Sequence, residues 1–214
     1  MKGLGLLLLT VGGGLQSAVV IDRIAVIVDK HVIKLSDIDL DLRITEFLNR
    51  QPLDVSADAR HKSAERLIEQ SIIREEIAAG GYQRASDANA GALLANLRRD
   101  RFHGSDAQMR GALSRYGLTE FQLESHFLWQ LTVLRFIDQR FRPGVLVTDD
   151  EVRAYYDNHI ADLRKENPQN SSIDALTPRI RASLEGEQIN RNFAEAMEGA
   201  RKRSRIRYSQ GAFL

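Results

Sequence analysis

The sequence predicts a mainly α-helical protein with a small β-sheet built from its two ends. Apolar residues recur at helical spacing through the middle of the chain, and a capping residue precedes most of these segments. Segment 19–28 (VVIDRIAVIV) is β-branched and almost continuously apolar, as in a strand covered on both faces. Segment 204–208 alternates charged and apolar residues, which is typical of an edge strand. With 43% hydrophobic and 28% charged residues, the 214-residue chain has the composition of a globular protein.

Residues 1–18 have the layout of a secretory signal peptide. Lys2 is followed by the apolar run 4–11 and by small residues that end at Ala18. The charged pair Asp22-Arg23 keeps the segment shorter than the roughly 20 residues that span a membrane. We therefore expect cleavage after Ala18 and export to the periplasm. The alternatives are an uncleaved anchor and an N-terminus that is merely hydrophobic.

The first half of the mature chain is expected to form a hairpin and four helices. A turn at 29–31 lets Val32-Ile33 pair back on the strand 19–28. Ser36 is expected to cap a helix from Asp37 to about Arg50. The next helices are expected at 58–79, from Ser86-Asp87 onward, and from Ser105-Asp106 to Tyr116.

Segment 119–141 is the long helix around which the rest of the chain is expected to pack. Thr119 and Gln122 have the spacing of a capping box. The helix carries two apolar stripes, whereas an ordinary surface helix has one. It is therefore buried on two sides, which we favour, or it leaves apolar surface for a partner. The first stripe is Leu123, Phe127, Leu131, Leu134 and Phe141, and the second is Trp129, Val133, Phe136 and Ile137.

The C-terminal third is expected to return to the N-terminal part. Pro143-Gly144 ends the long helix, and Thr148 with Glu151 begins another that runs to about Asn158. The polar segment 160–177 is typical of a loop. A last helix is expected from Pro178, capped by Thr177, to about Arg203, followed by the edge strand.

The sequence lacks the signatures of common enzyme and cofactor sites. It contains no P-loop, H-E-x-x-H or G-x-S-x-G motif, and its five histidines lie in separate elements. It contains no cysteine, so it forms neither a disulfide nor a thiolate metal site. Lys2 is the only charged residue of the first eighteen, and without it 29 basic residues balance 29 acidic ones. We expect no cofactor, no small-molecule substrate and no nucleic-acid partner.

Four segments, in the family's order, resemble the SurA family of periplasmic chaperones and related secreted foldases. They are VVIDRIAVIVDKHVIKLSDIDLDL, ARHKSAERLIEQSIIREEIAAGGY, ALSRYGLTEFQLESHF and LVTDDEVRAYY. The resemblance implies a helical chaperone module over 19–159, to which a C-terminal helix and strand (178–214) return. Such proteins usually carry one or two parvulin-type prolyl isomerase domains between these parts, where this chain has only 160–177. The resemblance thus implies the chaperone module without the isomerase, and no enzyme.

From these observations we predict an ATP-independent holdase that binds unfolded outer-membrane or other secreted polypeptides through an apolar groove. The residues expected to line this groove are Trp129, Val133, Phe136 and Ile137, for which core packing is the alternative. Another interpretation is a non-catalytic assembly protein that holds one specific periplasmic partner. Exchange of strands or helices between two copies is a further possibility in either case.

Overall fold

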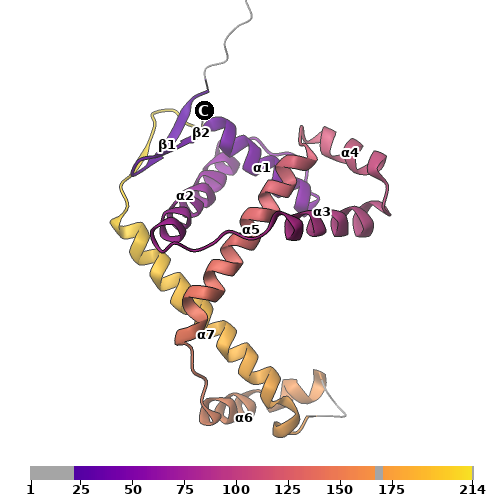
Figure 1. The fold of residues 1–214 in the computed structure, drawn as a ribbon, viewed down its shortest axis with the longest axis vertical. Coiled ribbons are helices and arrows are strands. Elements are labelled where there is room, and N and C mark those ends of the chain that lie inside the picture. The colour runs from indigo at the N-terminus through magenta and orange to yellow at the C-terminus, as the bar shows by residue number, and fades with distance from the viewer. Residues whose placement is uncertain (1–21, 167–170, 214) are drawn as a thin grey trace, which may run out of the picture.

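The computed structural model describes residues 22–166 and 171–213. This part of the chain forms seven α-helices and one three-stranded antiparallel sheet (Figure 1). The predicted fold class, mainly α with a small sheet, is confirmed. The predicted signal peptide 1–18 and the first residues of the predicted strand, 19–21, lie outside the described residues.

The sheet joins the two ends of the described chain. β1 (Ile24–Val28) and β2 (His31–Lys34) form an antiparallel hairpin through a turn at Asp29, whose φ is 53°. Aspartate is one of the few residues besides glycine that adopt this left-handed conformation routinely. β3 (Ile206–Tyr208) pairs antiparallel with β1 on its other side, which gives the order β2-β1-β3. The predicted return of the C-terminal strand is therefore confirmed.

Five helices make the body of the molecule: α1 (Leu35–Asn49), α2 (Ala57–Ala79), α3 (Asp87–Phe102), α4 (Asp106–Arg115) and α5 (Glu120–Phe141). The predicted caps Ser86, Ser105 and Thr119 are confirmed, because each side chain accepts a hydrogen bond from the backbone N–H three residues later. α2 begins one residue before its predicted start, and Ser56, for which no cap was predicted, caps it in the same way. Each such cap stabilises its helix by about 1 kcal/mol.

The start of α1 differs from the prediction. Ser36 does not cap the helix, which already begins at Leu35. The Asp37 carboxylate instead accepts a hydrogen bond from the backbone N–H of Lys34 at 2.9 Å. The Ser36 hydroxyl donates to Asp22 at 2.5 Å and so ties the helix to the segment before β1. The Ser36 hydroxyl, which local spacing predicts as the cap, therefore binds Asp22 outside the helix.

Three apolar cores hold the body together. The first joins the sheet and α2 to the end of α7 (Ile173–Arg203), the second joins α1, α3, α4 and α5, and the third joins α2, α5 and α7 around Phe136. The first contains Ala25, Val26, Val28, Ile33, Ile38, Ala64, Ile68, Ile72 and Ala200. In the second, Leu123 and Phe127 of α5 pack among residues that include Phe47, Leu94 and Leu113.

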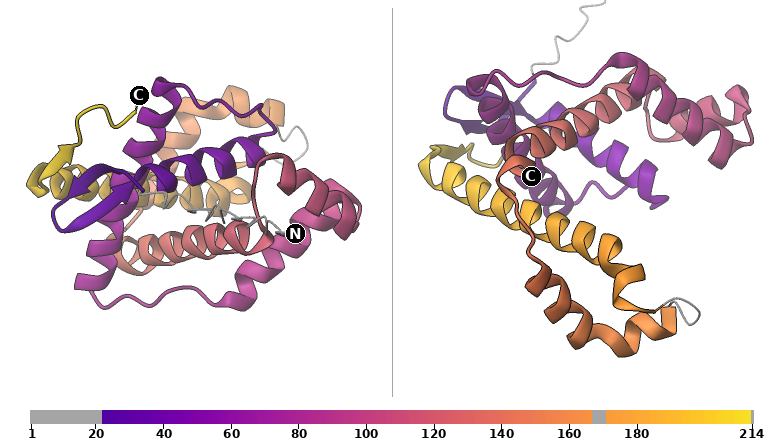
Figure 2. Two further views of the ribbon diagram at one scale, coloured as in Figure 1. Left: turned by 90° about the horizontal axis from the view of Figure 1, so that it is seen from above. Right: turned by 60° about the horizontal axis from the view of Figure 1, so that its bottom comes forward.

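The third part is an arm that projects from the body (Figures 1 and 2). The arm consists of α6 (Asp149–Glu166) and the first turns of α7, up to Leu184. The short 3-10 helix η1 (Arg142–Gly144) precedes it in the chain. The arm has its own small core, made by Val147, Val152, Leu163, Leu176 and Ile180. The second half of α7 turns Phe193 and Met197 toward α2 and α5, so one helix belongs to both parts.

The predicted loop 160–177 is largely helical, and that prediction was wrong. α6 continues to Glu166 and α7 already begins at Ile173, while 167–170 lie outside the described residues. The apolar side chains of Leu163 and Leu176 supply the reason, because each is buried against the other helix of the arm. The cap of α7 is Ser172, and the expected cap Thr177 donates to the carbonyl of Ile173 at 2.8 Å.

Side chains of α2 fix the C-terminal segment in place. The Tyr208 hydroxyl and the Arg201 guanidinium both donate to the carboxylate of Glu65, Arg201 at 2.6 Å. Burial raises the pKa of Glu65, but these two donors outweigh it and leave the pKa below its ordinary value. His61 of α2 stacks on the Tyr208 ring and contacts Phe213 edge-on.

Candidate functional site

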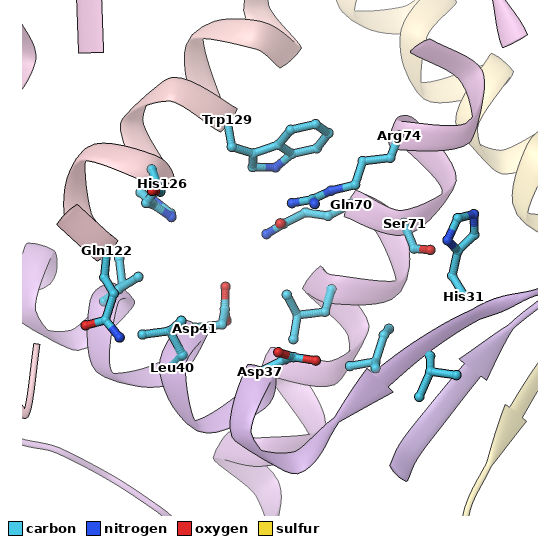
Figure 3. A pocket seen from close by; sticks show the side chains of 15 residues that line it. His31, Asp37, Leu40, Asp41, Gln70, Ser71, Arg74, Gln122, His126 and Trp129 are labelled. Carbon is cyan, nitrogen blue, oxygen red and sulfur yellow. The ribbon is translucent and has the colours of Figure 1, made fainter. Parts of the chain in front are cut away.

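A cleft of about 380 Å³ opens between β2, α1, α2 and the first half of α5 (Figure 3). It lies where the body brings together elements far apart in the sequence, and we call it the cleft below. Its walls are formed by His31, Val32 and Ile33 of β2; Asp37, Leu40, Asp41 and Ile44 of α1; Leu67, Gln70, Ser71 and Arg74 of α2; and Gln122, Ser125, His126 and Trp129 of α5.

Each helix contributes one face to the cleft. The lining residues of α1 and α2 follow one another at i, i+3, i+4 and i+7, and so do those of α5. Residues at this spacing lie on one side of a helix. On each helix this face carries both polar and apolar side chains, so the cleft has mixed walls and no continuous apolar stripe.

Trp129 and Arg74 form one side of the cleft. The Arg74 guanidinium carbon lies 4.2 Å from the centre of the Trp129 ring, a cation–π arrangement. Figure 3 shows Gln70 extending from α2 beside them, with Asp37 and Asp41 of α1 on the facing side. Partial burial lowers the pKa of Arg74, an effect that Asp37 opposes, and arginine remains cationic at neutral pH.

Asp41 is the buried polar anchor at the floor of the cleft. Its side chain is 7% exposed and accepts hydrogen bonds from the Ser63 hydroxyl at 2.7 Å and from Arg66 at 2.5 Å. A buried carboxylate is tolerated only when it is paired in this way. Asp41 therefore links α1 to α2, and its role at the cleft is structural.

Several other polar side chains of the cleft, among them Gln70, Arg74 and His126, have no hydrogen-bonding or ion-pairing partner within the described part of the chain. Burial lowers the pKa of His126, an effect that Asp41 opposes, so its imidazole is neutral at pH 7. The cleft therefore offers an amide, a cation and a neutral imidazole to a polar ligand.

The four residues predicted to form the client groove meet in one cluster between α2, α5 and α7. Phe136 is 1% exposed and packs with Ile73 and Ile77, whereas Trp129, Val133 and Ile137 are half-buried around it. Of the four, only Trp129 lines the cleft. Client binding by this set stays a prediction.

Most of the cleft was not singled out by sequence reasoning. Gln70 and Arg74 stand at i and i+4 on α2, and Gln122 and His126 do so on α5. This repeated polar spacing beside an apolar stripe was the available signal. It indicates a polar face on each helix. Nothing in a single sequence indicates that these faces of α1, α2 and α5 line the same cleft.

Among residues 22–166 and 171–213, no group of three or more histidine, aspartate and glutamate side chains is arranged to hold a metal ion. No helix in the same residues combines the length and the apolar character needed to cross a bilayer.

Comparison with known proteins points to chaperones. No protein-family model matches the chain. It is 29% identical over 136 residues to the chaperone SurA of Chromobacterium violaceum, which covers 62% of this chain and 31% of that protein. It is 28% identical over 86 residues to the chaperone for lacto-N-biosidase of Bifidobacterium longum, which covers 39% and 30%. The matched part thus spans less than a third of either relative.

Proposed function

We propose that this protein is a non-catalytic chaperone that binds unfolded polypeptide segments in the cleft without using a nucleotide. The observation that carries the proposal is the mixed lining of the cleft, where Trp129 offers apolar surface beside the uncommitted Gln70, Arg74 and His126. An unfolded chain presents apolar side chains together with polar backbone groups, and such walls match both. Two relatives named as chaperones support this reading.

The finer proposal concerns place and clients. We propose that the protein acts in the periplasm on unfolded outer-membrane proteins. The signal-like segment 1–18 and the similarity to a SurA chaperone support this. Barrel strands alternate apolar and polar residues and carry aromatic girdles, so before insertion they expose surfaces that pair and aggregate in water.

A second candidate is an assembly partner dedicated to a single protein. One relative is named as the chaperone of one enzyme, lacto-N-biosidase, which favours this class of function. The two candidates differ in breadth and use the same cleft. Exchange of strands or helices between two copies stays a prediction in both cases, and sedimentation at several concentrations measures it.

The breadth of clients is tested by light scattering. We expect the protein to suppress aggregation of several unrelated unfolded barrel proteins, with no change on adding ATP. Suppression for one client alone supports the dedicated partner, and suppression for none contradicts both candidates.

Replacing Trp129 with alanine should weaken client binding by roughly thirty-fold, the effect of losing an aromatic anchor worth about 2 kcal/mol. The matched control is Phe121→Ala on the same helix, since Phe121 is 77% exposed and outside the cleft. Trp129 is the only tryptophan of the chain, so its fluorescence reports binding of tryptophan-free clients to the wild-type protein. Equal client binding by both variants contradicts the assignment of Trp129.

We also expect no prolyl isomerase activity, because only residues 160–177 occupy the place of the isomerase domains in the family that the sequence resembles. A standard X-Pro peptide should isomerise at its uncatalysed rate, over tens to hundreds of seconds. A parvulin assayed in parallel serves as the positive control. Acceleration proportional to the concentration of this protein contradicts the proposal.

A further inference from the structure

The outer edge of β2 borders the cleft. We propose, on the basis of the function above, that a client binds there as an extended strand added to β2. The cleft then recognises the client's backbone, and side-chain preference is secondary. This deepens the proposed function, because it names the conformation in which clients are held.

The hydrogen bonds around β2 show which of its residues faces outward. In an antiparallel pair, alternate residues direct their backbone N–H and C=O away from the partner strand. The N–H of Lys34 donates to Asp37 on α1, whereas the N–H of Leu35 donates to the carbonyl of Arg23 before β1. Val32 shares the alternation of Lys34, so its backbone groups also point away from β1.

Val32 is accessible at this edge. Its residue is 46% exposed, and it lines the cleft together with His31 and Ile33. In the described part of the chain β2 pairs with β1 alone, so no third strand covers its outer side. The N–H and C=O of Val32 are a pair of groups that an incoming strand can bond.

The opposite edge of the sheet is protected. β3 presents Arg207, and Arg205 precedes it, and charged residues of this kind discourage strand addition. β2 also ends on a cation, Lys34, but its ammonium group pairs with Asp22 at 3.7 Å. The chain after β3 also stays on the sheet, because the N–H of Ser209 donates to the carbonyl of Ala25 at 2.9 Å. Arg205 and Arg207 also line a second cleft, of about 550 Å³, beside this end of the sheet. A strand that approached β3 would therefore meet these two arginines, so β2 is the more favourable edge.

The charges near Val32 match a peptide backbone. Arg74 supplies donors, Asp37 supplies an acceptor, and the amide of Gln70 supplies both. The free edge of a bound strand needs both donors and acceptors. A cationic ligand would be repelled by Arg74 and an anionic ligand by Asp37. Because strand side chains alternate with period two, every second one enters the cleft toward Trp129.

The edge is tested with Val32→Pro, which removes the outward N–H without removing a bond to β1. We expect it to weaken binding of a tryptophan-free peptide of alternating apolar and polar residues at least tenfold, measured by Trp129 fluorescence. Val32→Thr keeps the N–H and a β-branched side chain, so it should bind within about threefold of wild type. Val55→Pro is the matched control, because Val55 is an exposed valine outside the cleft.

A second measurement leaves the protein unchanged, in case Val32→Pro impairs folding. The same peptide with its central amides N-methylated should bind wild-type protein at least tenfold more weakly. Undiminished binding of that peptide, or of the folded Val32→Pro variant, overturns strand addition while the chaperone function stands. A concentration-dependent dimer that Val32→Pro abolishes, with client binding unaffected, also overturns it and assigns the edge to a second copy. Failure of wild type to bind any client contradicts the proposed function itself.

Discussion

A chain that ends at Glu166 is expected to lose its cooperative unfolding transition. This truncation removes α7 and β3, and with them Phe193, Met197 and Ala200 from the cores of the body. The truncation also removes Ile189, which is 6% exposed. A fully buried large apolar side chain contributes roughly 1.5–3 kcal/mol, and the half-buried Phe193 and Met197 each contribute part of that amount. The hairpin of β1 and β2 also loses its third strand, and a two-stranded hairpin is marginal in water. Against a total of about 5–15 kcal/mol, these losses are enough to unfold the rest.

A shorter truncation separates the contributions of the helix and the strand. A chain ending at Arg203 keeps α7 but loses β3, Tyr208 and Phe213, so we expect a partial loss of about 2–3 kcal/mol. For a protein of this size that corresponds to a melting temperature lower by roughly 5–10 °C. Thermal unfolding of the three chains by circular dichroism measures both effects. The same transition temperature in all three would show that the C-terminal segment is an appendage.

Replacing Phe136 with alanine is expected to destabilise the protein by about 3–5 kcal/mol, the usual cost of removing a buried phenylalanine. Its side chain is 1% exposed and makes edge-on ring contacts with Tyr82 and Phe141, at 5.0 and 5.9 Å between ring centres. The cavity left between α2 and α5 is closed in by helices that already pack elsewhere, so little collapse can refill it. Denaturant unfolding of the variant and the wild type measures the change.

The control is Leu134→Ala, two residues away on the same helix. Leu134 is 62% exposed, so its truncation should change the unfolding free energy by no more than about 0.5 kcal/mol. Were Phe136 a client-binding residue exposed in solution, its replacement would weaken client binding and leave stability close to that of Leu134→Ala. Measuring both quantities for both variants decides whether Phe136 acts in the core.

Local signals determined much of the fold. The capping residues Ser56, Ser86, Ser105 and Thr119 define where four helices begin, because a cap acts within one turn of its own helix. The alternation of charged and apolar residues at 204–208 likewise indicated β3. The apolar N-terminal hairpin needs a third strand, which indicated that β3 pairs with it. Each stripe of α5 places part of its residues in a core, Leu123 and Phe127 in one and Phe136 in another.

The same stripes show where local reasoning fails. Leu134 lies on the face of Leu123 and Phe127, yet it is exposed, because the core that α5 shares with α1, α3 and α4 extends no further than Leu131. Phe141, assigned to the same stripe, packs with Phe136 and Phe193 in the other cluster. Helical spacing fixes the direction of a side chain, but the length of the neighbouring helix decides whether anything covers it.

The sequence by itself determined the helices, the strands and the return of the C-terminus, because propensity, capping and apolar period act over a few residues. The tertiary structure alone decided that segment 160–177 closes a helical arm, since Leu163 and Leu176 are buried only against each other's helices. It alone also decided the cleft, where Asp37, Arg74 and Trp129 come from three helices distant in the chain. Contacts between distant helices depend on how those helices pack, and a local pattern of residues does not predict this packing.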